Sequence, residues 1–263
     1  PNNPNQFIWQ STRDGWNHLY LYDMNGKMLK QLTKGNWEVL DVKQFSRKGD
    51  ELYLISTRIS PIGKSIDVLN LKNGKLSGIT NDAYVHSAII SDDGNVVLDT
   101  YSGVDNPRTV RLINLSKNKS ENIFVAPDPL AGYQKADINI FTLPNIKGEE
   151  LFCKTFKPVN FDSTKKYPVI VYWYGGPHLQ LVTNSWNAGS GDYWFHYMAE
   201  RGYLVLSFDT RGSDNRGRDF EQEIFRNVGN KQMEDMMSVV SYLSRLGYAD
   251  TSRMGLFGWS FGG

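Results

Sequence analysis

The stretch Gly258-Trp259-Ser260-Phe261-Gly262-Gly263 decides how the second half of this sequence is interpreted. It follows an apolar run at 254–257, which predicts a short buried strand. A serine with one glycine two residues before it and another two residues after it, directly behind a strand, is the pattern of a nucleophile elbow. The reason is steric, because side chains at Gly258 and Gly262 would collide in the strained turn between strand and helix. An ordinary glycine turn is the alternative, since the motif alone is common.

The sequence before the elbow favours an α/β sheet. Continuous apolar runs at 167–174 and 203–208 are typical of strands buried on both faces of a parallel sheet, and 253–257 predicts a third. Helical patterns at 193–201 and 231–246 separate these strands, and each ends at a glycine. The order strand, helix, strand, helix, strand predicts a mostly parallel, doubly wound sheet. Two earlier strands are expected at 137–143 and 150–156, and four residues are expected on the core face of the second helix: Met233, Met236, Val240 and Leu243.

Three residues stand at the carboxyl ends of the predicted strands, where doubly wound sheets bind their ligands: Tyr174, Asp209 and Ser260. This convergence makes Ser260 the candidate nucleophile. The backbone N–H of Phe261 would be one oxyanion donor. The second donor should come from the loop after 167–174, where Tyr174 is either that donor or an aromatic core residue. Asp209 is interpreted as a brace for a loop.

The base that activates the serine and the acid that orients the base are expected after Ser260, in the order Ser, Asp or Glu, His. The chain begins without a methionine and stops three residues past Ser260. We therefore expect a truncated chain that is inactive as a peptidase, because a serine without its base is a poor nucleophile. His178 is interpreted as a loop residue near the site and His196 as helical. His18 and His86 lack metal-ligand spacing and are interpreted as structural, so no metal site is predicted.

The first 127 residues repeat a layout that ends at Thr33, Thr80 and Phe124, spacings of 47 and 44 residues. Each unit has about four short alternating strands joined by turns such as Asn25-Gly26 and Asn73-Gly74. This period is typical of β-propeller blades, with a β-sandwich as the alternative. Since a propeller needs about 4–8 blades to close, we expect the C-terminal blades of a larger one. The repeat ends at a proline-marked break, 126–129.

Composition limits the classes of function. With 40% hydrophobic and 22% charged residues, the chain is typical of a globular protein. A formal net charge of +1 gives no electrostatic argument for binding nucleic acid or an anionic membrane. Cys153 is the single cysteine, so it forms no internal disulfide. No apolar run is long enough to span a bilayer, and no signal peptide is visible.

Three motifs in combination resemble the prolyl oligopeptidase family: Tyr174-Gly175-Gly176-Pro177, Asp209-Thr210-Arg211-Gly212-Ser213 with Arg216-Gly217, and the elbow. The likeness covers nearly the whole chain and is to the dipeptidyl peptidase IV branch. Within that branch, 172–183 and 16–23 look most like bacterial prolyl tripeptidyl peptidases. One departure is Phe261, where the branch usually has tyrosine. Because the donor there is the backbone N–H, the oxyanion hole should be preserved.

The resemblance implies the end of an eight-bladed propeller at 1–127 and the N-terminal part of an α/β-hydrolase domain at 128–263. It implies a serine exopeptidase that releases short peptides from free N-termini after proline, with tripeptides as the first expectation. Ser260 would be the nucleophile, and Tyr174 with the Phe261 amide would form the oxyanion hole. Gly258, Trp259 and Gly262 would complete the elbow.

Two alternatives stay open: a dipeptidyl peptidase IV-type enzyme, and a propeller–hydrolase binding protein that has lost catalysis. The implied partners are peptide substrates. The resemblance implies no cofactor and no nucleic acid. It suggests a periplasmic, cell-surface or secreted bacterial protein, and it allows a homodimer.

Overall fold

The chain folds into two compact units in a computed structural model that describes residues 3–190 and 193–263. Unit 1 is Pro1–Pro127 with Asn215–Arg218, and unit 2 is Asp128–Asp214 with Asp219–Gly263. Pro1 and Asn2 lie outside the described residues. None of the helices in the described ranges has both the length and the apolar character needed to cross a membrane.

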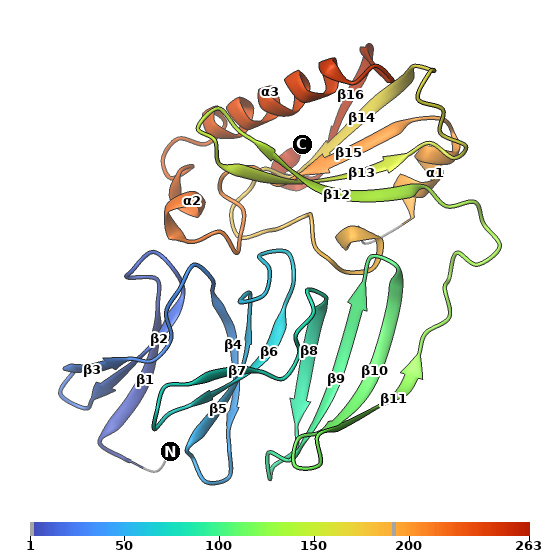
Figure 1. The fold of residues 1–263 in the computed structure, drawn as a ribbon. Helices are drawn as coiled ribbons and strands as arrows, with labels where there is room; N and C mark the ends of the chain where they lie inside the picture. The colour runs from blue at the N-terminus through green and yellow to red at the C-terminus, as the bar shows by residue number, and fades with distance from the viewer. Residues whose placement is uncertain (1–2, 191–192) are drawn as a thin grey trace. The chain divides into compact units, whose positions relative to one another are not determined.

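Unit 1 consists of antiparallel sheets whose strands follow one another in chain order (Figure 1). The first sheet holds β1 (Gln6–Ser11), β2 (His18–Asp23) and β3 (Met28–Gln31). The second holds β4 (Val39–Phe45), β5 (Glu51–Ser56), β6 (Ser65–Asn70) and β7 (Leu76–Gly78). The third holds β8 (Val85–Ile90), β9 (Val96–Gly103), β10 (Asn106–Asn114) and β11 (Lys119–Val125). A meander of about four strands is the form of a propeller blade.

The sheets of unit 1 stack on one another in chain order, with the second sheet in the middle. Side chains on β5 alternate between its two faces. Leu52 packs in one buried cluster with Leu19 of the first sheet, whereas Ile55 packs in another with Ile90 of the third sheet. A two-layer sandwich has no such middle sheet, so unit 1 is propeller-like.

The threonines that end the first two repeats occupy equivalent places. The Thr33 hydroxyl accepts a hydrogen bond from the Leu19 N–H at 2.9 Å. The Thr80 hydroxyl accepts one from the Ile66 N–H, also at 2.9 Å. The 47-residue spacing therefore marks the same point in two successive sheets.

His18 and His86 are buried structural residues, as expected. His18 Nδ1 lies 3.0 Å from the Thr33 hydroxyl. The His86 ring lies between Asp99, at 2.9 Å, and Asp82, at 2.7 Å. Burial lowers the pKa of His86, but its hydrogen bonds and charge attraction to the two carboxylates outweigh burial and raise that pKa above its usual value.

Unit 2 is built on a mixed sheet with the order β12-β13-β15-β14-β16. Its strands are β12 (Asp137–Pro144), β13 (Glu150–Lys157), β14 (Tyr167–Trp173), β15 (Leu204–Phe208) and β16 (Ala249–Gly258). β14 pairs in parallel with β15 and β16, whereas β12–β13 and β13–β15 are antiparallel. The expected sheet is mostly parallel. The structure differs because the β12–β13 hairpin joins β15 without a helical crossover.

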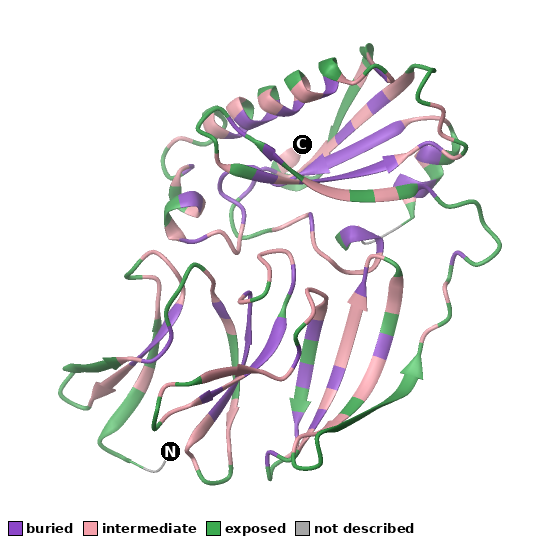
Figure 2. Cartoon of the chain, viewed as in Figure 1, coloured by how far each residue is buried: buried purple, intermediate pink, exposed green. Residues whose placement is uncertain are grey.

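Helices α1 (Trp194–Glu200) and α3 (Asn230–Arg245) cover opposite faces of this sheet. β15 is buried along its whole length (Figure 2). Its Leu206 packs in the same cluster as Met236 of α3, and the next side chain back, Val205, packs with Phe195 of α1. β14 lies between β15 and β16, so the carboxyl ends of the three parallel strands meet at one edge of the sheet.

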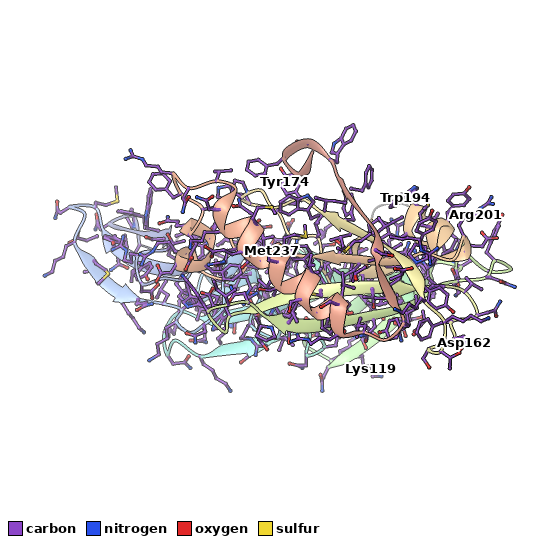
Figure 3. The ribbon with its side chains drawn as sticks, turned by 90° about the horizontal axis from the view of Figure 1, so that it is seen from above. Lys119, Asp162, Tyr174, Trp194, Arg201 and Met237 are labelled. Atoms are coloured by element: carbon purple, nitrogen blue, oxygen red, sulfur yellow. The ribbon has the colours of Figure 1, made fainter. Side chains whose placement is uncertain are left out.

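The core face of α3 differs from the expected one. Met233 is 46% exposed, so its assignment to the core is wrong, and Val240 is only partly buried. The buried stripe consists of Gln232, Asp235, Met236, Val239 and Leu243. Gln232 and Asp235 belong to this stripe because their side chains hydrogen-bond to buried loops. Met233 therefore lies off the stripe, one turn before Met237, which is exposed in Figure 3.

Candidate active site

The turn after β16 has the geometry of a nucleophile elbow. β16 ends at Gly258, and the 3-10 turn η2 (Ser260–Gly262) begins after Trp259. Ser260 has a φ of 54°, in the left-handed region that residues with a side chain rarely adopt. Holding a serine there costs on the order of 1–3 kcal/mol, a cost typical of functional sites. Ser260 is solvent-exposed, so a substrate has access to this residue.

The two glycines of the motif are required by space. A Cβ on Gly258 would lie 2.0 Å from the carbonyl oxygen of Gly262. A Cβ on Gly262 would lie 2.4 Å from the carbonyl oxygen of Trp173, at the end of β14. The φ of neither glycine lies in the left-handed region. Close approach of backbone to backbone, rather than conformational freedom, therefore excludes a side chain at both positions.

The loop after β14 lies against the elbow. The indole N–H of Trp173 donates to the carbonyl of Gly262 at 3.1 Å. The rings of Tyr174 (labelled in Figure 3) and Phe261 lie 6.0 Å apart between centroids. A Cβ on Gly176 would lie 2.6 Å from the Tyr174 ring and 2.9 Å from the Phe261 ring. The structure thus brings together both residues that the sequence analysis names as oxyanion donors.

Gln232 of α3 holds the loop after β14 in place. This role of Gln232 was not predicted from the sequence. Its side-chain amide N–H donates to the carbonyl of Gly175 at 2.9 Å, and its amide oxygen accepts from the Gly229 N–H at 2.9 Å. Gln232 is 1% exposed. A buried glutamine satisfied at both ends fixes the backbone directly after Tyr174.

Asp209 braces the next part of the same loop, as predicted. Its carboxylate accepts from the backbone N–H groups of Leu181, at 2.6 Å, and Val182, at 3.0 Å. Lys154 of β13 donates to the carbonyls of Leu181, at 2.6 Å, and Ala188, at 2.9 Å. Burial lowers the pKa of Lys154 to about 8, although the Asp209 carboxylate acts in the opposite direction. The sequence signal for Lys154 was a charge inside an apolar strand.

Arg211, in the loop after β15, is fully buried in a set of carboxylates. Its Nε donates to Asp235 at 2.9 Å, and its backbone N–H donates to the same carboxylate at 2.7 Å. Its other nitrogens donate to Glu234 at 2.8 Å and to Glu223 at 3.2 Å. Arg211 belongs to the motif Asp209-Thr210-Arg211-Gly212-Ser213, but the sequence alone gives it no role.

His178 lies in a loop and His196 on a helix, as expected. His178 lies in the loop after β14 and is exposed. His196 lies on α1, where its Nδ1 accepts from the Ala136 N–H at 3.2 Å and its Nε2 lies 3.1 Å from the Asn187 amide oxygen. Burial lowers the pKa of His196. These contacts give His196 a structural role.

Two family models match the chain. Residues 1–108 match the dipeptidyl peptidase IV (DPP IV) N-terminal region, and residues 190–263 match the prolyl oligopeptidase family. Dipeptidyl peptidase 8 of Homo sapiens is 32% identical over 248 residues, which cover 88% of this chain and 27% of that protein. Dipeptidyl peptidase 4 of Trichophyton equinum is 27% identical over 268 residues, which cover 100% of this chain and 35% of that protein.

Solved structures of two bacterial proteins are similar to this chain. A Bacteroides ovatus protein provisionally named dipeptidyl aminopeptidase IV has a TM-score of 0.93 and 38% identity, over 100% of this chain and 40% of that one. Porphyromonas gingivalis dipeptidyl peptidase 4 has a TM-score of 0.89 and 26% identity, over 99% of this chain and 37% of that one. The chain thus spans about a third of the length of these relatives.

Proposed function

Because the chain belongs to the prolyl oligopeptidase family, we propose that it carries the nucleophile and the oxyanion hole of a serine peptidase. The observation that carries the proposal is the strained, exposed Ser260 between two glycines that cannot accept a side chain. Backbone strain of this kind is concentrated at functional sites.

In the proposed reaction, Ser260 Oγ attacks the carbonyl carbon of the substrate and the negative charge develops on the carbonyl oxygen. The Phe261 N–H and the Tyr174 hydroxyl donate to that oxygen. Collapse of the intermediate releases the amine product and leaves an acyl-enzyme, which water hydrolyses. Gln232 and Gly176 support this geometry because they fix the loop that carries Tyr174.

The proton of Ser260 needs a base. Within unit 2 the described histidines are His178, which pairs with Glu221, and His196, which is bonded to Ala136 and lies against Asn187. We propose that the triad acid and base of the whole protein follow Ser260 in the sequence, in the order found in α/β-hydrolases.

We propose that the chain contains parts of two domains, with the boundary expected from the sequence. Residues 1–127 are propeller blades, and residues 128–263 are the N-terminal part of the peptidase domain. From the family resemblance of the sequence alone, we also propose that the protein acts outside the cytoplasm and that it can form a homodimer.

The proposed substrates are peptides with a free N-terminus and a proline at the cleavage site. Two kinds of product are in competition: the relatives are named dipeptidyl peptidases, whereas the motifs around Tyr174 favour tripeptides. We would compare kcat/KM of the full-length protein on chromogenic Xaa-Pro and Xaa-Xaa-Pro substrates, each with a free and a blocked amino group. We expect cleavage of the free forms alone, with a preference of at least about tenfold, some 1.4 kcal/mol, for one length.

Each result of this comparison has a definite meaning. Preference for Xaa-Xaa-Pro identifies a tripeptidyl peptidase, and preference for Xaa-Pro a dipeptidyl peptidase. Equal cleavage of the blocked forms would refute an exopeptidase. A full-length protein that cleaves none of the four would favour the binding-protein alternative.

Replacing Tyr174 by phenylalanine should lower kcat by about 10²–10³-fold and leave KM nearly unchanged, because the lost hydroxyl is expected to act on the transition state. The exposed Tyr197 on α1 offers a matched control, and Tyr197→Phe should leave both constants unchanged. Steady-state kinetics of the two variants provide the measurement. A Tyr174→Phe enzyme with wild-type kcat would remove Tyr174 from the oxyanion hole.

A further inference from the structure

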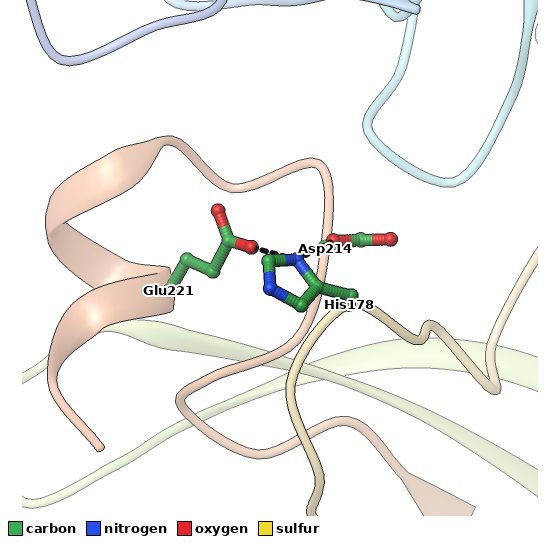
Figure 4. Close-up of side chains that lie close together, drawn as sticks. All are labelled: His178, Asp214 and Glu221. Atoms are coloured by element: carbon green, nitrogen blue, oxygen red, sulfur yellow. Dashed lines mark ion pairs between the residues drawn. The ribbon is translucent and has the colours of Figure 1, made fainter. Parts of the chain in front are cut away.

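Three metal-ligating side chains from separate segments meet on the surface of unit 2 (Figure 4). His178 comes from the loop after β14, Asp214 from the loop after β15, and Glu221 from α2 (Arg218–Gln222). His178 Nδ1 lies 2.5 Å from Glu221 Oε1 and 3.7 Å from Asp214 Oδ1. The three ligand atoms lie within 4.8 Å of one another.

The spacing fits a small transition-metal ion. Zinc binds imidazole nitrogen and carboxylate oxygen at about 2.0–2.2 Å, so neighbouring ligand atoms of a tetrahedral site lie roughly 3.3–3.5 Å apart. The His178–Asp214 separation is already close to this value. The His178–Glu221 separation must lengthen by about 1 Å. The His178 side chain is 78% exposed, so its ring has room to make this adjustment.

The electrostatics favour a cation at the same place. Glu221 is the least exposed of the three side chains, and Asp214 adds a second negative charge beside it. A divalent ion would compensate both carboxylates, whereas a protonated histidine carries one positive charge and compensates only one of them.

We propose that His178, Asp214 and Glu221 bind a divalent transition-metal ion, for which Zn²⁺ is the probe. Three protein ligands leave a fourth position for water. Imidazole in the ligand set favours Zn²⁺ over Mg²⁺, which prefers an octahedral shell of oxygen. The bound ion joins the loop that begins at Tyr174 to α2 and to the loop after β15. The site is defined by its own three residues and is independent of the proposed peptidase activity.

The site can be tested by metal binding alone. We would titrate the metal-free full-length protein with Zn²⁺ by calorimetry and measure its melting temperature with and without Zn²⁺. The other three histidines of this chain are buried, so an exposed imidazole is available only at His178 among the described residues. We expect Zn²⁺ binding that raises the melting temperature, and the same concentration of Mg²⁺ to have no effect.

Single substitutions then identify the ligands. His178→Asn and Glu221→Gln should each weaken Zn²⁺ binding by about tenfold or more, a loss expected when a ligand is removed. Asp137→Asn removes a carboxylate from the exposed end of β12 and should leave Zn²⁺ binding unchanged. Equal melting temperatures of all metal-free variants would show that they are folded. Wild-type Zn²⁺ affinity in His178→Asn, or no Zn²⁺ binding by the wild type, would overturn the proposal and leave a His178–Glu221 ion pair.

Discussion

Replacing Ser260 by alanine is expected to reduce kcat of the full-length protein by about 10⁴-fold or more, because the covalent step loses its nucleophile. Alanine keeps a Cβ at the φ of 54°, so the strained backbone and the space between the two glycines are retained. The melting temperature should therefore stay at the wild-type value. The measurement is kcat on the better proline substrate, together with covalent labelling by a fluorophosphonate probe, which should be lost.

Ser252 offers a matched control for this substitution. It is an exposed serine on the same strand, β16, where its hydroxyl donates to Asp250 at 2.6 Å. Ser252→Ala should keep wild-type kcat and wild-type labelling. Persistent labelling of the Ser260→Ala protein would show that another residue is the nucleophile. A wild-type protein that neither turns over nor labels would mean that the elbow is retained without catalysis.

Local features of the fold could be predicted because their signals lie within a few residues of one another. The strands predicted at 137–143 and 150–156 are β12 (Asp137–Pro144) and β13 (Glu150–Lys157). The clash predicted at Gly258 and Gly262 is confirmed, because a Cβ added there would lie only 2.0 and 2.4 Å from backbone carbonyl oxygens. Asp209 follows β15 directly, and its position was enough to predict a brace.

Long-range polar contacts could not be predicted from the sequence. Lys154 holds carbonyls 27 and 34 residues away, and Arg211 meets Asp235 24 residues away. The sequence shows which groups are charged, but the fold decides which of them meet. The same limit applies to the cluster at His178, since no fixed spacing marks its three ligands. On α3, the buried polar residues Gln232 and Asp235 form part of the core face, and Met233 lies outside it.

Replacing Asp235 by alanine is expected to lower the free energy of unfolding by about 3–5 kcal/mol, the usual cost of removing one partner of a buried ion pair. Asp235 is fully buried and accepts from both the side chain and the backbone of Arg211. The Arg211 side chain is 0% exposed. Loss of Asp235 removes the most buried carboxylate that pairs with its guanidinium. Urea unfolding of the full-length protein, followed by tryptophan fluorescence, should show a lower midpoint for the transition of unit 2.

Two further variants test whether the loss of stability comes from leaving the buried charge of Arg211 unpaired or from the loss of a contact alone. Glu234 pairs with the same guanidinium but is 34% exposed, so water replaces it and Glu234→Ala should shift the midpoint far less than Asp235→Ala. In the double variant Arg211→Met, Asp235→Leu no charge is left unpaired, so it should be more stable than Asp235→Ala despite losing both residues. Equal midpoints for Asp235→Ala and Glu234→Ala would contradict this account. They would mean that Arg211 reaches solvent when the loop after β15 relaxes, and that the loop's position depends on packing rather than on the buried charge.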